Sequence, residues 1–199
     1  MAKNLSFYLK SALGFLVNIM QIVQPCEIPA AASLRAVLAS KGGAFADCYC
    51  TEISGTISQS EFVEAFYTST LFKVERKLLA WFAGKPATDR DAARLANGSA
   101  TSFSAWTVES RSDDQLLLAD FTGRTKSWLM VAPSGDSTSG KMTTLYFGSA
   151  VLPEQNSSSV TPKMGFVFHA LLGFHKLYSK LLLRAARSRV LANRAARLP

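Results

Sequence analysis

A chain of 199 residues, 48% of them hydrophobic and 18% charged, is large enough for one folded domain and too apolar to be intrinsically disordered. Its net charge of +8 is concentrated at the carboxyl end, where residues 154–199 hold eight Lys or Arg and the single acid Glu154. Because the preceding residues are nearly balanced in charge, this last segment is where an anionic partner would dock; a solvated basic surface that binds no partner is the alternative.

Residues 1–43 are predicted to form an N-terminal helix followed by a linker segment. Residues 11–23 are mostly apolar, and polar residues recur there at every third or fourth position, which indicates a helix with one narrow polar stripe. Lys3 and Lys10 precede this apolar run, so a cleaved signal peptide and export remain an alternative. The run is too short to span a membrane.

A strand and several helices are predicted next. After a short helix over residues 34–40, residues 44–54 are typical of a strand. Ser58 and Glu61 form a capping box that begins a pair of helices reaching residue 82. A third short helix follows and ends at residue 97, before a glycine.

Four strands are predicted between residues 99 and 152, where the hydrophobic period changes to two. Their connections are short, and parallel crossovers need much longer ones, so the strands should form an antiparallel meander. The strands are expected at residues 103–111, 115–121, 124–132 and 141–152.

A long amphipathic helix is predicted from Pro162 to at least Leu191. One face is apolar, and the other carries basic residues at helical spacing. We call this second set the basic face, and it is the candidate surface for an anionic membrane: Lys176, Lys180, Arg184, Arg187 and Arg194.

The order of these elements resembles the START-like helix-grip superfamily, in which a curved antiparallel sheet wraps a long C-terminal helix around an apolar cavity. The resemblance covers roughly residues 44–190. The chain is also similar to uncharacterised bacterial members of that group through Trp106, Trp128 and the run Leu145-Tyr146-Phe147-Gly148. The resemblance implies an α+β fold in which residues 44–199 form one helix-grip-like domain, with the N-terminal helix as an addition.

The first functional hypothesis is a binding module that holds a small hydrophobic ligand between the sheet and the C-terminal helix. The candidate lining residues are Trp106, Trp128, Tyr146, Phe62 and Phe174, with His169 as a polar contact. The same side chains would serve equally as core. Two alternatives are a peripheral membrane or interaction protein that uses the N-terminal helix and the basic face, and an enzyme of lyase or cyclase type, which the resemblance implies.

No catalytic residue, metal site or cofactor is assigned. The chain lacks a glycine-rich phosphate loop, and its basic residues are not interleaved with exposed aromatics, so neither a nucleotide cofactor nor a nucleic-acid partner is expected. Cys48 and Cys50 would share one face of a strand, where a mutual disulfide would be strained. Unpaired, inert thiols in a reducing, cytoplasmic environment are the simpler prediction.

Overall fold

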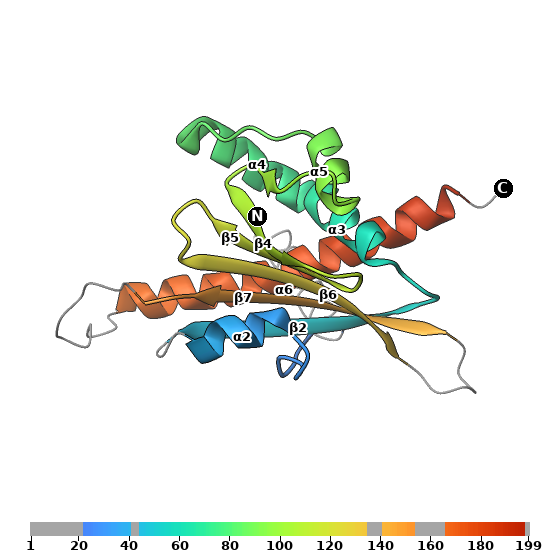
Figure 1. The fold of residues 1–199 in the computed structure, drawn as a ribbon, viewed down its shortest axis with the longest axis horizontal. Coiled ribbons are helices and arrows are strands. Elements are labelled where there is room, and N and C mark those ends of the chain that lie inside the picture. Colours follow the sequence, from blue (N-terminus) through green and yellow to red (C-terminus); the bar gives the residue numbers. More distant parts are fainter. Residues whose placement is uncertain (1–21, 41–43, 135–140, 154–165, 198–199) are drawn as a thin grey trace, which may run out of the picture.

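The protein is described by a computed structural model that covers residues 22–40, 44–134, 141–153 and 166–197; within these ranges, nothing is described of the side chains of residues 79, 82–83 and 166–174. The described residues form a curved seven-stranded antiparallel sheet with helices on both faces, which confirms the predicted α+β fold (Figure 1). The predicted N-terminal helix lies outside the described residues.

The strands lie in the spatial order β1-β2-β7-β6-β5-β4-β3, so the first long strand pairs with the last one. The predicted meander is confirmed, because β4, β5, β6 and β7 pair in sequence as antiparallel neighbours. The bounds are β1 (Gln24–Pro25), β2 (Phe45–Ser54), β3 (Ser102–Phe103), β4 (Trp106–Arg111), β5 (Gln115–Asp120), β6 (Thr125–Ser134) and β7 (Met142–Val151).

The helices divide between the two faces of the sheet. We call the face beneath α3 and α6 the inner face and the face beneath α2 the outer face (Figure 1). Both faces are buried, which explains why the sequence of β5 is a continuous apolar run. Leu116 and Leu118 lie on the inner face, whereas Leu117 lies on the outer face. The bounds are α2 (Ser33–Ser40), α3 (Gln59–Thr68), α4 (Thr70–Ala83), α5 (Asp89–Ala96) and α6 (Phe166–Ala195).

The Gln115 side chain joins the start of α2 to the outer face of the sheet by hydrogen bonds. Its side-chain oxygen accepts hydrogen bonds from the Ser33 backbone at 2.8 Å and from the Trp128 indole at 3.0 Å. Its amide nitrogen donates to the Ala31 carbonyl at 3.0 Å. One buried amide thus supplies hydrogen-bond partners to backbone groups at the start of α2 and to the Trp128 indole. Residues before 44 are therefore joined to the sheet by specific contacts.

The predicted pair of helices is confirmed: α3 and α4 are separated at Ser69, which leaves the helical conformation and caps α3. The structure differs from the expected elements in two places. The strand expected at residues 103–111 is split into β3 and β4 by Ser104, which has a positive φ of 55°. β1 was not expected, since two residues are too few to show a period.

The predicted capping box at Ser58 is confirmed and supplies a stability test. The Ser58 hydroxyl accepts from the Glu61 backbone at 3.2 Å, and the Glu61 carboxylate accepts from the Ser58 backbone at 3.0 Å. Ser58→Ala should therefore lower the free energy of unfolding by about 1 kcal/mol, measured by urea denaturation. Ser60→Ala, in the first turn of the same helix, should change it by less than about 0.5 kcal/mol. Equal effects of the two variants would contradict the capping role.

Candidate functional site

The chain segment that contains β1 crosses the outer edge of β2. β1 pairs with only two residues of β2, so in the described part of the chain most of that edge has no neighbouring strand. Val23, just before β1, is buried in the inner-face core, whereas Cys26, just after it, packs in the outer-face cluster. The segment thus passes from one face to the other, and a groove lies on each side of it.

The first groove lies between the start of β2 and α6, and we call it the edge groove. Its volume is about 450 Å³. On the α6 side stand Lys176, which is exposed, and Lys180, which is half-buried with its ammonium 5.6 Å from the centre of the Tyr49 ring. The other lining residues, only one of them charged, are Pro25, Cys26, Ile28, Phe45, Ala46, Asp47 and Cys48.

Asp47, the acidic residue of the edge groove, belongs to a polar cluster on the inner face. The Ser149 hydroxyl donates to Asp47 Oδ1 at 2.6 Å and lies 2.7 Å from His175 Nε2. The other carboxylate oxygen, Oδ2, lies 3.7 Å from the same Nε2. The cluster arises because Asp47 and Ser149 are register partners on β2 and β7, and His175 reaches them from α6.

This cluster is not a catalytic triad. In a triad the histidine uses one ring nitrogen for the serine and the other for the acid, whereas Ser149 and Asp47 both face Nε2 of His175. The arrangement therefore holds a carboxylate in place and does not activate the hydroxyl. Oδ2 of Asp47 is buried with no hydrogen-bond donor among the described residues. Such an atom marks a place where water or a ligand supplies the partner.

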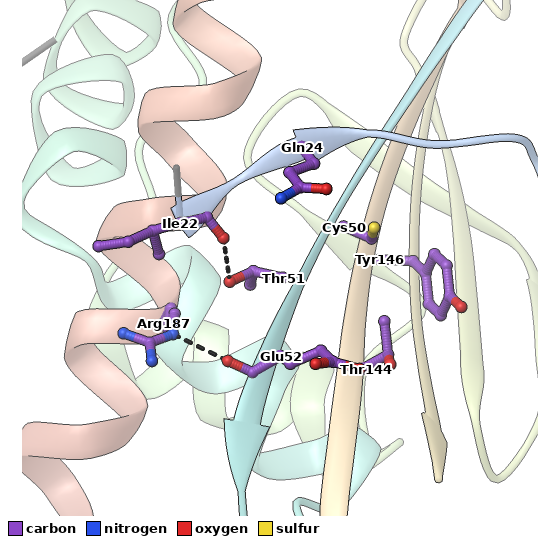
Figure 2. A pocket seen from close by; sticks show the side chains of 8 residues that line it. All are labelled: Ile22, Gln24, Cys50, Thr51, Glu52, Thr144, Tyr146 and Arg187. Atoms are coloured by element: carbon purple, nitrogen blue, oxygen red, sulfur yellow. Dashed lines mark hydrogen bonds between the residues drawn. The ribbon is translucent and has the colours of Figure 1, made fainter. Parts of the chain in front are cut away.

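The second groove lies on the other side of β1 and also measures about 450 Å³ (Figure 2). Its side chains are largely polar, and two of its contacts tie the β2 edge to its surroundings. The Thr51 hydroxyl donates to the Ile22 carbonyl at 2.7 Å, and Arg187 Nε donates to the Glu52 carbonyl at 3.1 Å. The lining residues are Ile22, Gln24, Cys50, Thr51, Glu52, Thr144, Tyr146 and Arg187.

A second polar group, half-buried, joins α4 to α6. The Tyr178 hydroxyl donates to the Glu75 carboxylate. Burial raises the pKa of Glu75, and the hydrogen bond from Tyr178 only partly opposes that rise. The neighbouring Tyr67 hydroxyl has no hydrogen bond within the described residues, and burial raises the pKa of Tyr67 as well.

The structure does not bring the predicted ligand-binding residues together. Phe62 and Trp106 belong to the inner-face core, whereas Trp128 and Tyr146 lie on the outer face with ring centres 6.2 Å apart. Figure 2 shows Tyr146 pointing away from α6. The division follows from the alternation of side chains along a strand, since both faces are apolar. Phe174 and His169 lie in the part of α6 whose side chains are not described.

Around Phe62 the inner-face core is filled with aromatic rings. Phe62 is fully buried, and its ring centre lies 6.2 Å from that of Phe66. Phe66 in turn packs on Phe147 of β7 at 4.9 Å. The residues chosen from the sequence as the lining of a cavity are, at this position, part of the packed core.

The basic face runs beside β2 and is partly used inside the fold. Lys176 and Lys180 border the edge groove, and Arg187 binds the Glu52 carbonyl. Arg194 binds the Thr56 carbonyl and forms an ion pair with Glu61 at 3.4 Å, and Arg184 is half-buried. The helical spacing predicted from the sequence is therefore that of a helix lying along an edge strand.

Sequence reasoning missed the cluster of Asp47, Ser149 and His175. Asp47 and Ser149 lie 102 positions apart, and no local motif links them. The signal that would have found them is the pairing of β2 with β7 in the observed register, which places a polar residue opposite a polar residue on an otherwise apolar face.

Two further properties concern metals and membranes. Within the described ranges, no group of three or more His, Cys, Asp or Glu side chains is arranged to hold a metal ion. No helix in those ranges is both long and apolar enough to cross a bilayer.

Comparisons with known proteins assign no family. No protein-family model matches the chain, and no curated protein matches it. Among solved structures, the chain is similar to an uncharacterized protein from Rhizobium leguminosarum, with 11% sequence identity, 71% of this chain and 97% of that chain covered, and a TM-score of 0.18. At that TM-score the similarity carries no argument about fold or function.

The buried Glu75 carboxyl predicts a pH dependence of stability. Its pKa is raised in the folded state, so its contribution to stability is fully present below its ordinary pKa and is lost as the pH rises through the folded-state pKa. Glu75→Gln keeps an acceptor for Tyr178 and removes the charge. The free energy of unfolding of this variant relative to the natural chain should therefore increase from pH 4 to pH 8. A difference that is independent of pH would show that Glu75 does not titrate in this way.

Proposed function

We propose that the protein is a binding module for a small molecule with an apolar body and an anionic head group, held in the edge groove between β2 and α6. The observation that carries the proposal is the composition of the groove. Two lysines of α6 line the groove together with the apolar residues Pro25, Ile28 and Phe45. Its volume of about 450 Å³ lies within the range of small-molecule sites.

The two lysines favour an anionic head group such as a carboxylate. Lys176 and Lys180 are one helical turn apart, so both side chains line the same groove. Asp47 also lines the groove and sets one negative charge against the two positive ones, so the lining keeps a net positive charge. Because Lys180 is half-buried, its contact with an anionic ligand is stronger than the same contact in open water.

The order of the elements supports membership of the START-like superfamily, which forms part of this proposal. In that superfamily the ligand site lies between the sheet and the C-terminal helix, and the edge groove lies at that boundary. The membrane reading of the basic face stays a prediction, and two of its arginines are engaged by β2 and α3.

The proposal is tested by dye binding. Anilinonaphthalene sulfonate, an apolar anion, should bind the delipidated protein at about one equivalent and more weakly at high salt. Replacing Lys176 and Lys180 together by Gln should weaken that binding about tenfold, since two charge contacts are lost. Nile red, an uncharged apolar dye, should be much less affected. The measurement is a fluorescence titration.

The matched control removes two charges elsewhere. Lys77 and Arg189 are exposed and do not line the edge groove, so Lys77→Gln with Arg189→Gln should leave anilinonaphthalene sulfonate binding within about twofold of the natural chain. An equal loss in both double variants would mean that net charge, and not the groove, attracts the dye. Absence of saturable binding by either dye would overturn the proposed function.

A further inference from the structure

The three cysteines of the chain meet where the segment containing β1 crosses the β2 edge. The sulfur atoms of Cys26 and Cys48 lie 3.4 Å apart, and the Cys26 backbone donates to the Cys48 carbonyl at 3.0 Å. Cys50 lies two residues further along β2, where its thiol also interacts with that of Cys26. Cys26 and Cys48 line the edge groove, and Cys50 lines the second groove, so the cluster forms part of the wall between them.

The backbone positions suit one disulfide and oppose another. Cys26 and Cys48 lie directly opposite each other on antiparallel segments, where Cα atoms are about 5.5 Å apart, within the range that a disulfide spans. The sulfurs need to approach by little more than 1 Å to reach the bond length of about 2.0 Å. Cys48 and Cys50 are two apart on one strand, where a bridge would be strained.

The thiols of Cys26 and Cys50 are poorly reactive at neutral pH. The hydrogen bond to Cys48, together with burial, raises the pKa of Cys26 far above its ordinary value. Burial is also the largest cause that raises the pKa of Cys50 to about 12. Because the thiolate is the nucleophile, oxidation of this cluster should be slow. The contact geometry, and not thiol reactivity, selects the pair that becomes linked.

We propose that Cys26 and Cys48 are a redox modification site that forms a reversible intramolecular disulfide by exchange with a low-molecular-weight disulfide such as glutathione disulfide. The partly exposed Cys26 thiolate attacks one sulfur of that oxidant and releases one glutathione thiolate, which leaves a mixed disulfide. The Cys48 thiol then gives up its proton, attacks the Cys26 sulfur and releases the second glutathione. Two protein thiols are oxidised, and one glutathione disulfide is reduced to two glutathiones.

The bond would fasten the segment containing β1 to the edge strand that it crosses. It closes a loop between positions 22 residues apart and removes conformations of the unfolded chain. It would also fix the wall shared by the two grooves. The site stands on the sulfur contact alone and does not depend on the proposed ligand.

The test uses the folded full-length chain incubated with excess glutathione disulfide, followed by denaturation, alkylation and intact mass measurement. The expected product has lost two hydrogens, keeps one alkylatable thiol and yields a linked peptide joining Cys26 to Cys48. Its midpoint of thermal unfolding should rise by about 5–10 °C and return to the starting value after reduction.

Single substitutions distinguish the pair from the third thiol. Cys50→Ser should still form the bond, whereas Cys26→Ser should give only mixed adducts with glutathione. Cys26→Ala and Cys50→Ala repeat the comparison if a serine variant fails to fold. A chain that keeps three alkylatable thiols, carries three glutathione adducts or links Cys48 to Cys50 would overturn the proposal, as would a linked chain whose unfolding midpoint is unchanged.

Discussion

The pairing of β2 with β7 is the constraint on which the rest of the structure depends. The two strands are in register over ten residue pairs, from Phe45↔Val151 to Ser54↔Met142. This ladder places β2, the first long strand, beside the end of the meander. Among the described residues only β1 pairs with part of the other side of β2, which we call the free edge. The ladder also sets Asp47 opposite Ser149 on the inner face. The core, the free edge and the polar cluster are therefore products of one set of backbone hydrogen bonds.

The free edge explains why the lysines of the edge groove and the three cysteines lie in one region. An exposed strand edge offers unpaired backbone groups and invites association with other chains. Here it is crossed by the segment containing β1 and flanked by α6, whose Arg187 binds an edge carbonyl directly. Some basic residues of α6 thus form contacts within the fold, which the net charge of the helix does not indicate. Two other bases of α6, Lys176 and Lys180, line the edge groove.

Local sequence signals predicted the elements well and the site poorly. Ser58 with Glu61, the period of two after residue 99 and the amphipathic spacing of the last helix are properties of neighbouring residues, and the elements that they predict are present. When both faces of a sheet are apolar, the sequence does not indicate which face an aromatic residue of a strand takes, so it places Trp106 and Trp128 in one cavity although they lie on opposite faces. Asp47, Ser149 and His175 become neighbours only through long-range pairing.

The same long-range ladder has a consequence for biosynthesis. Partners in the β2–β7 pair are separated by roughly a hundred residues, so their pairing requires a large loop closure and is intrinsically slow. During translation β2 leaves the ribosome long before β7 exists, and buried apolar residues such as Ile53 lack their β7 partners in that interval. Nascent chains of this topology are exposed to misassociation until the last strand emerges, which makes them natural clients of chaperones that shield apolar strands.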